Sequence, residues 1–189
     1  MISHPNPRRV AIIGGAEGAT LREVLKHKSV KEVVMVEIDE EEVDICEEYL
    51  PEWSDCSDFS EEESCFDDER ATVIFADAFG WFIDRYSNEE TGEEKFDAIV
   101  MDALDPDKFV SIVGSLYKSD EFVRSLFNGL SEEGVVSVAR KRPRLKSSRA
   151  TLTSTSTTYQ FVMQSGQCDS LADPAEDSGP SQDEIHMVR

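Results

Sequence analysis

The sequence has no apolar run long enough to cross a lipid bilayer, which takes about 20 predominantly apolar residues in a helix. Its first residues, MISHPNPRR, also lack the apolar core of a signal peptide. Both absences argue against a membrane protein and against export. We therefore expect a cytoplasmic protein without a membrane partner.

Positive charge is scarce: 19 Lys and Arg residues stand against 40 Asp and Glu residues, for a formal net charge of −21 at pH 7. Nucleic acids and anionic membranes carry phosphate, so a chain this acidic is not expected to bind either of them. The charge favours small cationic ligands, or it serves solubility alone, and composition does not distinguish these interpretations. The length of 189 residues fits one domain with a sizeable core.

Cysteines are few and scattered. No two of them form a CxxC pair, and no histidine lies at the spacing of a metal ligand. We therefore expect neither zinc nor another bound metal, and we expect reduced thiols in an intracellular setting. The four cysteines are Cys46, Cys56, Cys65 and Cys168.

The most informative stretch is RVAIIGGAEGATLREVLKHKSVKEVVMVEID, residues 9–39. Its apolar runs VAII and VVMV predict two buried strands of a parallel sheet, with a glycine-rich turn and a helix between them. Gly14, Gly15 and Gly18 allow a tight turn whose backbone can approach a ligand at the helix N-terminus. Glu37 ends the second strand at the place where a carboxylate can bind both hydroxyls of a ribose.

Two interpretations of the glycine turn are open. The glycines either serve the geometry of a βα connection only, or they bind a nucleoside-containing ligand, which the acidic strand end favours. The spacing in GGAEG lacks the third glycine of the dinucleotide fingerprint, so NAD is not the expected ligand.

The rest of the first 139 residues alternates between helical and strand patterns. This alternation predicts an α/β fold with a Rossmann-like, doubly wound parallel sheet. Asp120 is a candidate N-cap for the last predicted helix, and residues 110–117 could cover the site. The predicted helices span residues 40–49, 79–86 and 120–130, and the further strands span residues 71–76, 96–101 and 134–138.

The segment from Glu52 to Glu69 is about half acidic. Such a run repels itself, which favours a solvated, mobile surface loop. The alternative is that the loop draws cations toward the site.

The character of the chain changes beyond Ala139. Residues 140–149, RKRPRLKSSR, are strongly basic, and a Ser/Thr-rich stretch follows them. We therefore divide the chain into a core of residues 1–139 and a disordered tail of residues 140–189, in which only residues 159–163 hint at a short ordered piece. The basic run is interpreted as a solvated linker or as a nuclear-localisation signal.

Three carboxylates end three successive predicted strands: Glu37, Asp77 and Asp102. The carboxyl ends of parallel strands line one crevice, and Glu17 in the glycine turn would join them there. Burying an unpaired carboxylate costs roughly several kcal/mol. Carboxylates that converge on one crevice therefore predict a ligand that donates hydrogen bonds or carries positive charge. For Asp77 the alternative is a helix N-cap.

Taken together, four segments carry a resemblance to a known family: HPNPRRVAIIGGAEGATLREVLKH, VVMVEID, ADAF and MDALDPD. They are similar to the corresponding motifs of the polyamine aminopropyltransferases, the spermidine and spermine synthases, over roughly residues 4 to 138. The resemblance implies a methyltransferase-like Rossmann fold. It also implies decarboxylated S-adenosylmethionine as co-substrate, an amine such as putrescine or spermidine as acceptor, and no other cofactor.

The same resemblance implies roles for individual residues. Asp102 would be the catalytic carboxylate of the DxxDP motif, and Asp105 would lie on the acceptor side. The remaining residues would bind the donor: Gly14, Gly15 and Gly18 by their backbone, Glu37 at the ribose, Asp77 at the adenine and Glu17 at the aminopropyl end.

The sequence also departs from the family pattern. Glu17 stands where the family has Asp, Ala16 replaces a glycine, and the family's N-terminal β-rich domain and C-terminal acceptor contacts have no counterpart here. The chain therefore resembles a donor-binding core with altered flanks, and its catalytic activity is left open. A homodimer is one assembly that the resemblance allows. The alternatives are a methyltransferase that uses full S-adenosylmethionine, or a non-catalytic donor-binding protein.

Overall fold

The structure is a computed structural model that describes residues 4–88, 92–103, 119–140 and 159–164. These residues form a six-stranded sheet in the order β3-β2-β1-β4-β5-β6. The first five strands run parallel and β6 is antiparallel to β5. The strands are β1 (Arg9–Gly14), β2 (Glu32–Glu37), β3 (Ala71–Phe75), β4 (Phe96–Asp102), β5 (Leu130–Arg140) and β6 (Tyr159–Gln164).

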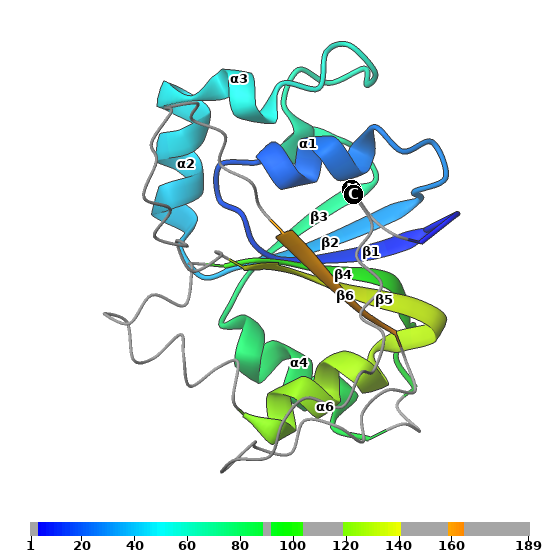
Figure 1. Cartoon of the computed structure of the whole chain (residues 1–189). Helices are drawn as coiled ribbons and strands as arrows, with labels where there is room; N and C mark the ends of the chain where they lie inside the picture. The colour runs from blue at the N-terminus through cyan, green and yellow to red at the C-terminus, as the bar shows by residue number, and fades with distance from the viewer. Residues whose placement is uncertain (1–3, 89–91, 104–118, 141–158, 165–189) are drawn as a thin grey trace, which may run out of the picture.

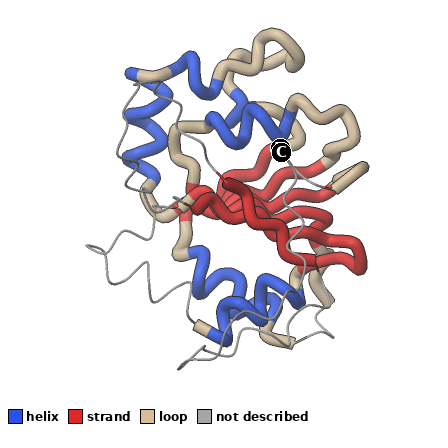
Figure 2. The backbone as a smooth tube through the Cα atoms, viewed as in Figure 1, coloured by secondary structure: helices blue, strands red, loops and turns tan. Residues whose placement is uncertain are grey.

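Helices cover both faces of the sheet (Figure 1, Figure 2). One face carries α1 (Ala19–Leu25) and α3 (Pro51–Ser54), with α2 (Glu40–Tyr49) beside them, and the other face carries α4 (Ala78–Tyr86) and α6 (Asp120–Asn128). The doubly wound, Rossmann-like arrangement predicted from the sequence is therefore confirmed.

The central strands are apolar in their middle parts, where both of their faces are buried, and their charged residues lie near the ends. In β1, Ala11 and Ile13 pack on the side of α4 and α6, while Val10 and Ile12 pack on the side of α1. The α4 side is built largely from aromatic rings, among them Phe82, Phe96 and Phe122. The α1 side is aliphatic and includes a disulfide.

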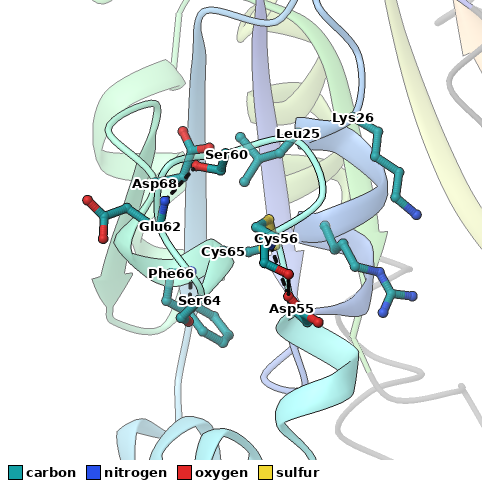
Figure 3. Close-up of a disulfide and its surroundings, with 12 residues drawn as sticks. Leu25, Lys26, Asp55, Cys56, Ser60, Glu62, Ser64, Cys65, Phe66 and Asp68 are labelled. Atoms are coloured by element: carbon teal, nitrogen blue, oxygen red, sulfur yellow. Dashed lines mark hydrogen bonds between the residues drawn. A yellow bond between two sulfur atoms is a disulfide. The ribbon is translucent and has the colours of Figure 1, made fainter.

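The disulfide joins Cys56 to Cys65, both fully buried against Leu25 of α1 (Figure 3). The prediction that all thiols are reduced is therefore wrong for this pair, whereas Cys46 is a free thiol. The two half-cystines lie nine positions apart along the chain, and their Cα atoms are 5.1 Å apart, a distance in the range that a disulfide requires.

The acidic segment that contains this disulfide, predicted as a solvated and mobile surface loop over residues 52–69, has regular structure in part. It contains α3, a bridge between Asp55 and Ser64, and the short 3₁₀ helix η1 (Cys65–Asp67). Phe59 and Phe66 pack against the same cluster as the disulfide. The apolar residues of the segment face α1, while most of its acidic side chains remain exposed. The overall acidic composition does not show which residues are buried.

Three further expectations are settled or qualified by the structure. Ser119, not Asp120, is the N-cap of α6, and its hydroxyl accepts from the Phe122 N–H at 3.4 Å. The ordered piece expected at residues 159–163 is confirmed as β6. This strand lies in the segment assigned to the tail and pairs with β5. The predicted cover at residues 110–117 and the rest of the tail lie outside the described residues.

Candidate active site

The glycine turn follows β1, from which the chain adds strands first on one side of the sheet and then on the other. β1 lies between β2 and β4, and β4 leads on to β5. In open α/β sheets, ligands bind outside the carboxyl ends of the strands at this kind of switch point. Here those ends bring together the β1–α1 turn, Glu37 on β2 and Asp102 on β4.

Glycine is required in this turn for two reasons. Gly14, Gly15 and Gly18 all have positive φ angles, of 80°, 89° and 78°, which side chains other than glycine rarely adopt. Space is also lacking: a Cβ on Gly14 would lie 2.7 Å from the Asp102 carbonyl oxygen, and one on Gly15 would lie 3.1 Å from Asp102 Oδ2. The turn is therefore packed directly against the end of β4.

Asp102 is half-buried and is held from α1. The Thr20 hydroxyl donates to Asp102 Oδ2 at 2.5 Å. Thr20 was not among the predicted site residues, because it lies 82 positions from Asp102 in the sequence. The available signal was a hydroxyl in the first turn of the helix that follows the glycines.

Glu37 is buried, with 6% of its surface exposed. Its Oε1 accepts from the backbone N–H groups of Ile38 at 2.6 Å and Asp39 at 3.1 Å. These two bonds fix the carboxylate at the end of β2, as predicted for a residue at the rim of the site.

The pKa of Glu17 reflects the nearness of other carboxylates. Burial raises the pKa of Glu17 above its usual value, and repulsion from the charges of Asp102, Glu42 and Glu37 raises it further. The strand ends and the glycine turn thus bring three of the four predicted carboxylates to one edge of the sheet. Glu42, in the first turn of α2 and not predicted from the sequence, adds to the negative charge around Glu17.

Asp77 has a different local role. It caps α4, with Oδ1 accepting from the Phe79 N–H at 3.1 Å and Oδ2 from the Gly80 N–H at 3.4 Å. The alternative prediction, that Asp77 is a helix N-cap, is therefore confirmed. Asp77 still lies beside the site, since the Ala76 N–H donates to the Glu37 carbonyl at 2.9 Å.

Glu17, Glu37 and Asp102 form what we call the acidic rim. Its charge is that of a site for cations. Within the described ranges, no ion pair joins Glu17, Glu37 or Asp102 to a basic side chain. A ligand with positive charge and hydrogen-bond donors would relieve their mutual repulsion. Asp105 lies outside the described residues.

No group of three or more His, Cys, Asp or Glu side chains is arranged to hold a metal ion in the described part of the chain. Among the described helices, none is long and apolar enough to cross a membrane.

The strand order β3-β2-β1-β4-β5, the glycine turn after β1 and the carboxylate ending β2 define the class as a Rossmann-like fold of the methyltransferase type. The sequence profile of the spermine/spermidine synthase domain matches residues 1–165, and the chain belongs to this family. The resemblance found in the sequence is thereby confirmed.

Several relatives carry the name polyamine aminopropyltransferase. The protein from Pyrobaculum islandicum is 39% identical over 136 residues, which is 72% of this chain and 42% of that one. The protein from Hyperthermus butylicus is 50% identical over 107 residues, or 56% of this chain and 32% of that one. The protein from Thermococcus onnurineus is 32% identical over 186 residues, or 98% of this chain and 51% of that one. The chain thus spans between a third and a half of the length of these relatives.

Solved structures agree with the fold. Spermidine synthase from Thermotoga maritima superposes with a TM-score of 0.53 at 32% identity, covering 72% of this chain and 38% of that chain. A spermidine synthase in complex with the transition-state analogue AdoDATO gives a TM-score of 0.57 at 34% identity, covering 72% and 40%.

Proposed function

We propose that this chain is the donor-binding core of an aminopropyltransferase of polyamine biosynthesis. It would transfer the aminopropyl group of decarboxylated S-adenosylmethionine to an amine such as putrescine or spermidine. The observation that carries the proposal is the group formed by Glu17, Glu37 and Asp102 around the glycine turn. The names of the relatives and the analogue bound to the similar spermidine synthase support it.

The residues of the site other than Asp102 and Asp105 bind the donor. The two hydroxyls of the ribose donate hydrogen bonds to the Glu37 carboxylate. These bonds offset the free-energy cost of burying that carboxylate. The backbone of Gly14, Gly15 and Gly18 lets the donor approach the sheet closely. Asp77 accepts from the adenine amine at the rim, and Glu17 lies near the ammonium of the aminopropyl group.

Asp102 acts on the acceptor. The attacking amine must be neutral to be a nucleophile, so the carboxylate orients it and accepts its proton. The nitrogen forms a bond to the carbon beside the sulfonium, the carbon–sulfur bond breaks, and its electron pair neutralises the sulfur. Methylthioadenosine leaves. Alignment of the two substrates supplies much of the acceleration, and Asp105 is proposed to hold the acceptor.

The acidic rim also selects between donors. Full S-adenosylmethionine carries an additional carboxylate that Glu17 and Asp102 would repel, whereas the decarboxylated donor has only positive charge there. The proposal includes a cytoplasmic location and small cationic partners rather than nucleic acid.

Calorimetry and a turnover assay on the full chain test the proposal. We expect decarboxylated S-adenosylmethionine to bind at least about tenfold more tightly than S-adenosylmethionine, as a repulsion of about 1.4 kcal/mol requires. Asp102→Asn should abolish transfer to putrescine and spermidine while the donor Kd stays within about threefold. Asp44→Asn, at an exposed position on α2, is the matched control.

Each outcome has a distinct meaning. Equal binding of the two donors would favour a methyltransferase-type protein. Donor binding without turnover of any amine would indicate a non-catalytic donor-binding protein. Turnover by Asp102→Asn at the wild-type rate would remove Asp102 from the mechanism.

A further inference from the structure

Thr20 occupies a position from which its side chain serves the site rather than its own helix. It is the second residue of α1, and it is half-buried. The N-cap of the helix is Gly18, a residue without a side chain that could accept from the first helical N–H groups. The Thr20 hydroxyl instead donates to Asp102 Oδ2 on β4 at 2.5 Å.

This bond distinguishes the two oxygens of Asp102. Oδ2 receives the Thr20 hydroxyl and lies 3.1 Å from the point where a Gly15 Cβ would stand, so it faces the glycine turn. Within the described residues no hydrogen bond reaches Oδ1. A hydrogen bond to one carboxylate oxygen restricts rotation of the group and leaves the other oxygen free to accept from a ligand.

The orientation of Asp102 matters because the carboxylate has to meet the attacking amine. Asp102 lies among like charges, since Glu17 is repelled by Asp102, Glu42 and Glu37. A carboxylate held in one orientation can accept the proton of an amine at a defined position.

We propose that Thr20 is a positioning residue for aminopropyl transfer, which fixes the orientation of the Asp102 carboxylate and presents Oδ1 to the attacking amine. The inference rests on the proposed function. Thr20 acts through Asp102 and does not itself contact either substrate.

The test compares Thr20→Val, which keeps the shape of the side chain and removes the hydroxyl, with Thr20→Ser, which keeps the hydroxyl. Thr72→Val, on the exposed side of β3, is the matched control for the loss of a hydroxyl. The carbon-13 signal of the Asp102 carboxyl group, assigned with Asp102→Asn, is followed by NMR in the full chain. Steady-state kinetics and donor binding are measured on the same variants, and circular dichroism checks their fold.

We expect Thr20→Val to lower kcat by about tenfold to a hundredfold, the effect of losing a hydrogen bond to a charged group. The donor KM should stay within about threefold, because the lost interaction acts on the reacting amine. The Asp102 carboxyl signal should move in Thr20→Val and return to its wild-type position in Thr20→Ser, with kcat restored.

An unmoved Asp102 signal in Thr20→Val would overturn the inference, as would a Thr20→Ser variant impaired as strongly as Thr20→Val. The NMR comparison needs no turnover. If the wild-type chain transfers no aminopropyl group, the proposed function fails, and the carboxyl signal still decides whether Thr20 holds Asp102.

Discussion

Glu17 combines partial burial with like-charged neighbours. Its raised pKa means that the folded protein binds this proton more readily than the unfolded chain does. The ionised form therefore opposes folding at neutral pH, and this cost disappears as the pH falls through the raised pKa. A cationic ligand removes the same cost while Glu17 stays ionised.

Replacement of Glu17 by Gln should accordingly have opposite effects on folding and on binding. We expect the free energy of unfolding at pH 7 to rise by about 0.5–1 kcal/mol, the range for partly exposed charges. The difference from wild type should shrink toward pH 4. Affinity for decarboxylated S-adenosylmethionine should fall by about tenfold, since one close charge pair contributes about 1–2 kcal/mol.

Urea unfolding at pH 7 and pH 4 and calorimetry check both effects. Glu61→Gln, at an exposed position of the acidic segment, is the control and should change neither quantity. If Glu17→Gln destabilised the protein and bound the donor as tightly as wild type does, Glu17 would have a structural role instead of a ligand-binding one.

At the scale of elements, the acidic segment and α1 form a unit. A Cβ on Gly18 would lie 2.7 Å from Ser54 and 3.0 Å from Phe66. Ser54 precedes the first half-cystine in the sequence, and Phe66 follows the second. Arg22 donates to the Glu52 carbonyl at 2.6 Å, and Arg70 pairs with Asp68 and donates to the Leu25 carbonyl at 3.0 Å. The segment therefore fixes the helix that starts at the glycine turn.

Loss of the disulfide should loosen this unit. Closing a loop of this length stabilises a fold by about 2–3 kcal/mol, and we expect the wild-type chain to lose about that much when a phosphine reductant is added. Urea unfolding with and without the reductant measures the loss. The double variant Cys56→Ala and Cys65→Ala should be insensitive to the reductant, and an equal response of both proteins would contradict the assignment of the bond.

Local patterns predicted the elements well and contacts between distant segments poorly. The runs VAII and VVMV identify buried strands because apolar residues on both faces leave no other environment for them. The pairing of Cys56 with Cys65 depends on how the acidic segment folds onto α1, which no spacing rule contains. Thr20 and Glu42 were missed for the same reason, since each joins the site only through the packing of its helix. Asp77 was ambiguous because a residue that ends a strand can also begin a helix.

On the scale of the whole molecule, the net charge of −21 should act on binding at long range. An acidic protein concentrates cations around itself, and salt screens this field within about 8–10 Å at physiological ionic strength. The carboxylates of the site and the exposed acidic segment then favour a charged donor together. A neutral nucleoside should respond only to its direct contacts at the carboxyl ends of the strands.

We therefore expect salt to separate the two kinds of ligand. The affinity for decarboxylated S-adenosylmethionine should fall several-fold when the ionic strength rises from about 0.01 M to about 0.15 M, because the Debye length shrinks from about 30 Å to about 8 Å. The affinity for methylthioadenosine, which has the same nucleoside and no positive charge, should change by less than about twofold over this interval. Calorimetric titrations of both compounds at the two ionic strengths provide the comparison. An identical salt response would mean that recognition depends on the nucleoside alone and that the acidic rim contributes nothing to the choice of a cationic donor.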